Sequence, residues 1–405
     1  MELENVQGRA PAAPESGGLA AQWLLGLLGR LRHGCLTVRF GDGASRPVLG
    51  ERSGPAANLT IRRPWRFAAR ILARGDLGLG EGFVAGDWDT PQPAQALHVL
   101  AANEQQLLPA GTGRLARVLD RLQHLRRRND HRGSRRNIAF HYDLGNDFYR
   151  LWLDPGMTYS AALFAEPGEP LAVAQERKYE RVLDRLRARP GEHILEIGCG
   201  WGGFAEHAAR RGYRVTGITL SREQLAYARD RIAAAGLADR VELRLQDYRD
   251  VAETFDHVIS IEMFEAVGET YWSTYFDTVR RVLRPGGRAS LQVITIDDGF
   301  FAQYRRATDF IQKYVFPGGM LPSVPAFDTA ARGSGLDVLD RSFHGIDYAD
   351  TLRRWDASVC AARDRILALG FDERFLRLWR YYLGYCEAGF RTGRIDLMQV
   401  ALTRG

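Results

Sequence analysis

Short apolar runs alternate with stretches of helical periodicity over the second half of the chain. The first run, residues 193–197 (HILEI), is typical of a buried parallel strand, and a helical pattern begins at Phe204 after a glycine-rich turn. Similar runs predict strands at residues 214–218, 241–245, 257–261 and 289–295, with helices at 221–236 and 271–283. This alternation predicts an α/β fold with a doubly wound, mostly parallel sheet, in which residues 336–340 and 395–403 form a terminal pair of strands.

The first part of the chain has a weaker pattern. It predicts strands at 36–40 and 59–61 and helices at 67–73 and 93–108, with a glycine-rich stretch at 75–90. These elements predict a small α+β domain over residues 19–110, preceded by a disordered tail at residues 1–18.

An arginine-rich segment, residues 111–140, connects this domain to a second one over residues 141–405. Apolar side chains recur at helical spacing within residues 114–136, and arginines fill most of the other positions. Two interpretations remain open: a basic amphipathic helix on a membrane surface, or a linker helix that packs one face on its neighbour.

Charge and composition narrow the range of partners and compartments. The net charge is +6 at pH 7, which favours an anionic partner such as a membrane or a nucleic acid. No apolar run reaches the roughly 18 residues of a membrane-spanning helix, and the acidic start of the chain is unlike a secretory leader. We therefore expect a cytoplasmic protein. The four cysteines lack metal-ligand spacing, so no metal site is expected.

The glycine turn after residues 193–197 is a candidate ligand site. Glu196, Gly198, Gly200 and Gly202 follow the order E-x-G-x-G-x-G, unlike the G-x-G-x-x-G of dinucleotide-binding turns. Glycines let a ligand approach the backbone, and this order suits a ligand with an adenosine and an amino-acid tail, so S-adenosylmethionine is the candidate cofactor. An ordinary strand-to-helix turn is the alternative. We interpret Cys199 as a small residue that fits this turn rather than as a reactive thiol.

Other loops at the same edge of the sheet complete the predicted crevice. They are residues 219–220, 246–248 and 262–266, each after the carboxyl end of a strand. Thr219 stands where dinucleotide enzymes place a ribose-binding acid, so NAD fits poorly. Residues 298–327 then interrupt the alternation with many aromatic and aliphatic side chains. This insertion would either cover a lipid-sized pocket or bury a core of its own.

Seven motifs make the chain recognisable through their order and spacing. They are HYDLGNDFY (141–149), MTYS (157–160), EIGCGWGG (196–203), GITLSREQ (217–224), QDYRD (246–250), MFEAVG (263–268) and FPGGMLPS (316–323). Together they resemble the cyclopropane-fatty-acid synthase family, which includes the mycolic acid methyltransferases, over about residues 75–405. The resemblance implies a class I S-adenosylmethionine-dependent methyltransferase fold with a seven-stranded sheet. It also implies an unsaturated phospholipid acyl chain as the substrate and a lipid- or membrane-associated N-terminal domain.

The resemblance assigns residues to the cofactor. Tyr159 and Ser160 of the MTYS motif would close over it. From the methionine part through the ribose to the adenine, the assigned residues are Glu196, Gly198, Cys199, Gly200, Thr219, Leu220, Gln224, Gln246, Asp247 and Tyr248.

The implied reaction needs a dry site and a base. An isolated cis alkene is a weak nucleophile, and its attack on a sulfonium methyl leaves a carbocation on the acyl chain, which water would quench. In the family the base resembles a bicarbonate held by a cysteine after MTYS, the glutamate of M-F-E-H, a fifth-strand histidine and a downstream tyrosine. Glu265 and Tyr348 match two of these positions. The changed positions are Ala161 for the cysteine, Ala266 for the histidine after the glutamate, and Gln292 for the fifth-strand histidine.

Two products therefore stay open. If bicarbonate binds through Glu265, Gln292 and Tyr348, the ring closes to a cyclopropane. If it does not, because Ala161 has no polar side chain for an anion, the product is a methyl- or methylene-branched acyl chain. We predict the second product. The candidate catalytic residues are Glu262, Glu265, Gln292, Tyr348 and His141, with Glu265 or Glu262 as the base.

Two alternatives come from other functional classes. The changed positions would also be found in a non-catalytic homologue that only binds lipid or cofactor, and the basic charge would suit an RNA methyltransferase. The aromatic insertion favours lipid over nucleic acid. We therefore expect a cytoplasmic protein bound peripherally to the inner face of the membrane, with the phospholipid bilayer as its partner. A homodimer and a reductase that saturates a methylene product are compatible further partners.

Overall fold

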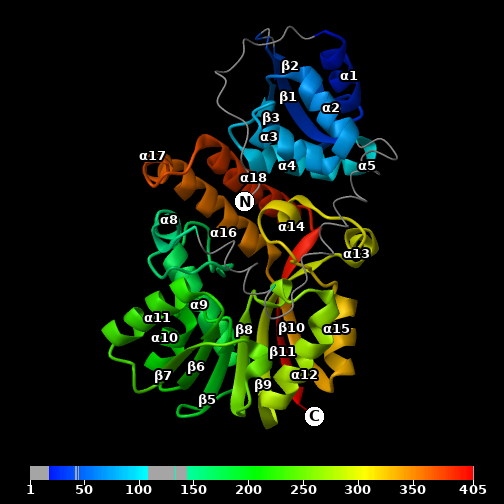
Figure 1. Ribbon diagram of the computed structural model, residues 1–405. Coiled ribbons are helices and arrows are strands. Elements are labelled where there is room, and N and C mark those ends of the chain that lie inside the picture. Colours follow the sequence, from blue (N-terminus) through cyan, green and yellow to red (C-terminus); the bar gives the residue numbers. More distant parts are fainter. Residues whose placement is uncertain (1–17, 42, 44, 108–132, 134–143, 405) are drawn as a thin grey trace. The chain divides into compact units, whose positions relative to one another are not determined.

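The computed structural model describes residues 18–41, 43, 45–107, 133 and 144–404. The chain divides into two compact units, residues 1–114 and 115–405, each described by itself (Figure 1). The predicted tail up to residue 17, His141 and the predicted linker apart from residue 133 lie outside the described residues. Over the described ranges, no helix has both the length and the apolar character needed to cross a membrane.

A four-stranded sheet with the order β2-β1-β3-β4 forms the centre of the first unit. Its strands are β1 (His33–Phe40), β2 (Ser45–Leu49), β3 (Arg52–Ile61) and β4 (Trp88–Asp89). The helices are α1 (Leu19–Leu28), α2 (Pro64–Arg74), α3 (Asp76–Val84), α4 (Pro93–Ala102) and α5 (Glu104–Leu107). The predicted strands at 36–40 and 59–61 lie within β1 and β3, and the predicted helix at 67–73 lies within α2.

Helix α3 lies in the glycine-rich stretch at 75–90, for which no helix was predicted. A Cβ atom added at Gly78 would lie 2.1 Å from the backbone oxygen of Arg70, so a glycine there lets α3 contact the backbone of α2. At Gly82 an added Cβ would lie 3.2 Å from the side chains of Phe67 and Trp88. Glycine has low helix propensity, but here close packing requires it, and tertiary contacts outweigh the local preference.

A seven-stranded sheet forms the centre of the second unit and confirms the predicted fold class. Its order is β10-β11-β9-β8-β5-β6-β7, and β11 runs antiparallel to both of its neighbours. The strands are β5 (His193–Ile197), β6 (Arg214–Thr219), β7 (Val241–Leu245), β8 (Phe255–Ile261), β9 (Leu283–Ile296), β10 (Leu336–Phe343) and β11 (Ile395–Arg404). The carboxyl ends of β5, β6, β7 and β8 therefore meet at one edge, as the crevice prediction requires.

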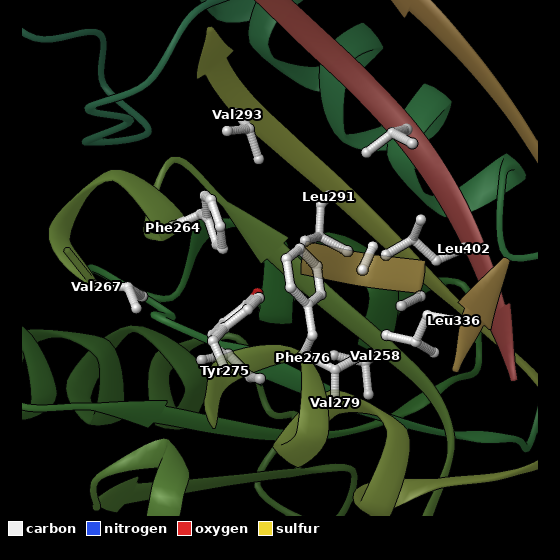
Figure 2. Packing of buried hydrophobic residues seen from close by; sticks show 14 of the residues in the cluster. Val258, Phe264, Val267, Tyr275, Phe276, Val279, Leu291, Val293, Leu336 and Leu402 are labelled. Atoms are coloured by element: carbon white, nitrogen blue, oxygen red, sulfur yellow. The ribbon is translucent and has the colours of Figure 1, made fainter. Parts of the chain in front are cut away.

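The main core of this unit lies between the sheet and helix α12 (Trp272–Val282). Figure 2 shows Tyr275, Phe276 and Val279 of α12 facing Val258 of β8 and Leu291 of β9. The apolar positions of α12 recur at helical spacing, which explains why this face is buried. The remaining helices are α8 (Asn146–Arg150), α9 (Leu171–Asp184), α10 (Gly203–Arg210), α11 (Arg222–Ala234), α13 (Asp298–Tyr304), α14 (Phe310–Tyr314), α15 (Val324–Gly333) and α17 (Arg363–Ala368).

Two long helices, α16 (Gly345–Ala361) and α18 (Glu373–Arg391), pack on each other between β10 and β11 in the chain. Their buried faces are aromatic and include Tyr348, Trp355 and Trp379. The predicted insertion at 298–327 contains α13 and α14. Phe310 packs on Tyr381 of α18 at a ring distance of 4.5 Å.

Candidate active site

The glycine turn between β5 and α10 has the geometry of a ligand cradle. Gly198, Gly200 and Gly202 all have positive φ angles, of 87°, 52° and 79°, which favour glycine. A Cβ at Gly198 would lie 2.9 Å from the Met263 side chain, whereas no atom lies within 4 Å of a Cβ built at Gly200. Burial raises the pKa of the Cys199 thiol well above its usual value, which supports its interpretation as a small packing residue.

Glu196 supplies a buried carboxylate just before the turn. It is 3% exposed, and its Oε2 atom has no hydrogen-bond partner among the described residues. Burial raises its pKa to about 8, although Lys178 and Arg231 act in the opposite direction. A buried, unpartnered carboxylate oxygen of this kind suits a cationic ligand group.

The loops after β6 and β7 hold the other assigned residues. Thr219 donates a hydrogen bond to Gln224 Oε1 (3.1 Å), and the Gln224 amide donates to the hydroxyl of Ser221 (3.2 Å), the residue that precedes α11. The carboxylate of Asp247 is buried and accepts hydrogen bonds from the backbone and guanidinium of Arg249. Tyr248 packs on Tyr275. Leu220, and Gln246, which donates to the Asp250 carbonyl, are half-buried in the same loops.

The MTYS motif crosses between helices α9 and α16. Tyr159 lies among aromatic rings and shares a hydroxyl–hydroxyl hydrogen bond of 2.8 Å with Tyr382 of α18. Ser160 is turned toward α9, where Lys178 donates to its hydroxyl (2.6 Å) and Gln175 donates to its carbonyl (2.8 Å). On the other side, the Ala162 amide donates to Thr351 of α16 (3.1 Å).

Glu262 is the centre of the candidate catalytic group. Its Oε1 accepts hydrogen bonds from the Ala161 amide and from Gln292 Nε2, each at 2.8 Å, and its Oε2 accepts one from the Tyr348 hydroxyl at 2.5 Å. Gln399 of β11 donates to Gln292 Oε1 (2.9 Å) and so orients that amide. The structure therefore brings together three of the predicted catalytic residues, Glu262, Gln292 and Tyr348.

The backbone conformation of Glu262 and the pKa of its carboxyl are both unusual. Its φ angle is +50°, a left-handed conformation that costs a non-glycine residue about 1–3 kcal/mol and that occurs at functional sites. Its amide donates to the Gln292 carbonyl (2.8 Å), which fixes this conformation. Burial raises the pKa of the carboxyl, and the three donors together with Lys178 oppose that rise.

Glu265 lies on the adjacent 3₁₀ turn, η2 (Phe264–Ala266), and does not join this group. Its Oε1 accepts from the Ile294 amide (2.5 Å), and its Oε2 is buried with no partner among the described residues. Burial, and then the nearby Glu262, raise the pKa of its carboxyl to about 8. The two candidate bases thus differ in their surroundings, since hydrogen-bond donors reach both carboxylate oxygens of Glu262, whereas Glu265 Oε2 has no partner among the described residues.

Sequence reasoning missed the groups that surround Glu262. Ala161 contributes its backbone amide, which no side-chain argument reveals. Gln399 and Gln175 lie outside the seven motifs. Lys178 had one available indication: it is a lysine spaced by four residues from the apolar Ala174 and Val182, which is the spacing of one helix face.

The family model described as mycolic acid cyclopropane synthetase matches residues 129–400 of this chain. The chain belongs to the mycolic acid cyclopropane synthetase family. Tuberculostearic acid methyltransferase UfaA1 of Mycobacterium tuberculosis is 40% identical over 405 residues, covering 98% of this chain and 93% of the relative. Cyclopropane-fatty-acyl-phospholipid synthase of Escherichia coli is 36% identical over 368 residues, covering 89% and 91%.

A solved structure described as mycolic acid cyclopropane synthase CmaA1 complexed with SAH and CTAB has the same fold. It is 31% identical, with a TM-score of 0.62, and the match covers 66% of this chain and 97% of that one. This mycolic acid cyclopropane synthetase family member is therefore an S-adenosylmethionine-dependent methyltransferase, which confirms the prediction of an enzyme with this cofactor. The alternative of a non-catalytic homologue is set aside.

The residues present fit that cofactor. When bound, S-adenosylmethionine supplies an electrophilic methyl group on sulfur. Gly198 and Gly200 leave the backbone accessible, and the unpartnered oxygen of Glu196 suits the ammonium of a methionine part. Asn146 of the first motif accepts a hydrogen bond from the Trp201 indole (2.7 Å) and links α8 to the same turn.

Proposed function

We propose that this enzyme methylates the cis double bond of an unsaturated phospholipid acyl chain and gives a methyl- or methylene-branched chain, with Glu262 as the base. The observation that carries the proposal is the binding of the Glu262 carboxylate by the Ala161 amide, Gln292 and Tyr348. These are three of the four positions that would hold bicarbonate in a cyclopropane synthase. A side chain of the protein thus takes the place of the free anion.

Bicarbonate does not fit beside this arrangement. The donors that an anion would need are already used by Glu262, and Glu265 is directed at the Ile294 amide. A bicarbonate ion would also stand next to the carboxylate of Glu262, and two neighbouring anions repel each other. Glu262 already raises the pKa of the Glu265 carboxyl. We therefore derive no step through bicarbonate.

The role of Glu262 follows from the chemistry of the substrate. A new bond between an alkene carbon and the methyl group breaks the methyl–sulfur bond and leaves a carbocation on the neighbouring chain carbon. A hydride shift moves the positive charge to the carbon that bears the new methyl. Glu262 then accepts a proton, either from that methyl, which leaves a methylene branch, or from the chain, which leaves a methyl-branched alkene. One proton enters Glu262 and no oxidant or reductant is needed.

Similar proteins support a branched product. A relative that covers 98% of this chain is named tuberculostearic acid methyltransferase UfaA1. A second, from Pseudomonas putida, 39% identical over 285 residues, is named a probable fatty acid methyltransferase. The E. coli relative is named a synthase of cyclopropane rings in phospholipids, so ring closure is the alternative product.

The proposed site of action is the surface of a phospholipid bilayer. Helix α2 of the first unit exposes an apolar stripe, with Trp65 (56% exposed) and Leu72 (51% exposed) on one side of the helix. Ala69 and Ala73 are exposed at the intervening helical spacing, and Arg66 lies beside Trp65. A tryptophan and a leucine with adjacent arginines suit the interface of an anionic membrane.

Product analysis with methyl-deuterated S-adenosylmethionine tests the proposal. Vesicles of dioleoylphosphatidylglycerol serve as the substrate, and the fatty acids are analysed by mass spectrometry and NMR. We expect a branched chain carrying two deuterium atoms as a methylene, or three as a methyl. A cyclopropane in the wild-type product would overturn the proposal.

Bicarbonate dependence tests the base directly. Wild-type activity should be the same in carbon-dioxide-free buffer and in buffer with added bicarbonate. Glu262→Ala should lose at least about a thousandfold in kcat, and added bicarbonate or acetate should restore part of it, because the three donors remain. Wild-type activity that requires bicarbonate would contradict the assignment of Glu262.

A further inference from the structure

Lys178 of α9 is a buried cation for which the mechanism above has no use. Its side chain is fully buried, and one hydrogen bond, to the Ser160 hydroxyl, accounts for only one of its three N–H donors. Its ammonium lies 4.2 Å from the centre of the Tyr179 ring. Over the described residues, no carboxylate oxygen lies within 4.0 Å of it. A buried charge with so few contacts is unfavourable, so its retention calls for a reason.

The contacts of α9 lead directly to Glu262. Lys178 and Gln175, three residues apart on one helix face, bind the hydroxyl and the carbonyl of Ser160. The Ser160 carbonyl and the Ala161 amide belong to one planar peptide group. Gln175 therefore binds one end of this peptide while the other end donates to Glu262 Oε1. Helix α9 aims the amide at the base, and Lys178 lies beside the same peptide.

Titratable groups from several elements surround Glu262 and Lys178. The groups that face Glu262 are Lys178 of α9, Glu265 of η2 and the Tyr348 hydroxyl of α16, and the groups behind Tyr348 are Tyr159, Tyr382 and Cys386. Burial lowers the pKa of Lys178 to about 8, so it is still mostly a cation at pH 7, and the carboxyl groups that oppose this fall are Glu262, Asp154 and Glu196. Among all these groups, Lys178 is the cation, and it faces three acids.

We propose that Lys178 is a positioning residue for the reaction, whose charge keeps the Glu262 carboxylate ionised and ready to accept a proton. This inference rests on the proposed function, because it gives Glu262 the role of base. Without a nearby cation, burial would favour the protonated form of Glu262 and remove its basic form. Ion pairs at moderate distance are strong in a dry interior.

Replacement of the lysine by the neutral Lys178→Met variant tests the proposal. The measurement is the pH dependence of kcat on dioleoylphosphatidylglycerol vesicles with saturating S-adenosylmethionine. Loss of a cation raises the pH needed to ionise Glu262, so the acidic limb of the profile should move up by about one pH unit or more. Lys178→Arg keeps the charge and should return the limb to the wild-type position. Lys178→Gln replaces Lys178→Met should that variant fail to fold.

Gln175→Met is the matched control. It removes a buried hydrogen bond from the same helix to the same peptide but changes no charge, so it should lower kcat and move the acidic limb by less than Lys178→Met does. Infrared spectra of Lys178→Met and of its double variant with Glu262→Gln give a second readout. Besides the bands of the protonated Glu196 and Glu265 carboxyls, the single variant should show a further protonated carboxyl band near neutral pH that the wild type and the double variant lack.

The outcomes separate the two proposals. An acidic limb that stays in place in Lys178→Met, or moves equally in Gln175→Met, would overturn the role of Lys178 alone. A Glu262→Gln variant with undiminished activity would instead overturn the proposed function. A moved limb together with an inactive Glu262→Gln variant supports both.

Discussion

Glu262 combines a strained backbone with three hydrogen bonds to its carboxylate. The left-handed conformation is unfavourable for a residue with a side chain, but it directs the carboxylate at the Ala161 amide, Gln292 and Tyr348. Hydrogen bonds to an ionised group contribute more than those between neutral groups, so they offset the strain. A fixed carboxylate in a partly buried position is suited to remove one proton from one place.

The hydroxyl of Tyr348 should affect both rate and pH dependence. Tyr348→Phe removes a donor to the Glu262 carboxylate, an interaction of about 1.5–3 kcal/mol, so kcat should fall by about 10- to 100-fold. The pKa of Glu262 should rise, because a group that stabilises its anion is lost, and the acidic limb of the kcat profile should move to higher pH. Tyr213→Phe, whose hydroxyl contacts the remote Ala188 carbonyl, is the matched control. Equal effects in both variants would count against the role of Tyr348.

Glu196 should make cofactor binding proton-linked. Since burial raises the pKa of its carboxyl to about 8, it is mostly protonated near pH 7 before binding. A cationic ligand group next to it lowers that pKa, so binding should release up to about one proton at pH 7. Calorimetric titration in buffers of different ionisation enthalpy measures this release. Glu196→Gln should abolish it, and equal release in the variant would assign the proton to another group.

The raised pKa of Glu265 should make stability depend on pH. The folded state holds this proton up to about pH 8, whereas the unfolded chain loses it near pH 4.5, so the free energy of unfolding should decrease as pH rises between these values. Glu265→Gln removes this contribution. Urea unfolding at pH 6 and pH 9 should therefore show a smaller loss of stability for Glu265→Gln than for the wild type, and an equal loss would refute the explanation.

The candidate site could be predicted in part, because motifs identify side chains in order. Glu262 was named because it opens the loop after a predicted strand, and Gln292 and Tyr348 because they stand at the fifth-strand histidine and downstream tyrosine positions of the family. Ala161 was counted against anion binding because alanine has no polar side chain, yet its backbone amide donates to Glu262. Backbone donors and the positive φ of residue 262 depend on the folded path of the chain, which no residue type specifies.

At the scale of elements, the strands of the sheet could be predicted from the apolar pattern of the sequence, whereas the close-packed helices could not. Five parallel strands were recognisable because strands buried on both faces are continuously apolar. Helix α3 was missed because its glycines serve close contact with α2, so local propensity opposed the observed structure. The pair α16 and α18 lies in a region for which we predicted no element, although α16 carries Tyr348.

The glycine turn between β5 and α10 should not tolerate a side chain at its first position. Gly198→Ala places a Cβ 2.9 Å from the Met263 side chain and forces alanine into a left-handed conformation that costs about 1–2 kcal/mol. Stability should fall and the dissociation constant for S-adenosylmethionine should rise at least tenfold. Gly236→Ala, at a φ of +67° with no atom within 4 Å, should show the conformational cost alone. Unchanged cofactor affinity in Gly198→Ala would contradict the assignment of this turn.

At the scale of the whole molecule, the exposed stripe of α2 should control contact with the lipid. Trp65→Ala combined with Leu72→Ala should weaken binding to anionic vesicles by about tenfold or more, because both side chains would otherwise bury apolar surface at the interface. Sedimentation with the vesicles measures this loss, and S-adenosylmethionine affinity should stay the same. Leu369→Ala, at an apolar residue that is 46% exposed in the second unit, is the control. Equal vesicle binding by the double variant and the wild type would locate the membrane contact elsewhere.

The left-handed backbone at residue 262 also bears on how such enzymes diverge. Glycine adopts this conformation without strain, and glutamate codons differ from glycine codons at a single base. One nucleotide change would therefore remove the tethered carboxylate, relieve the backbone and leave three donors aimed at open space. The descendants of such a mutant would need a dissolved anion to take the proton, so the lipids they make would depend on the carbon dioxide available to the cell.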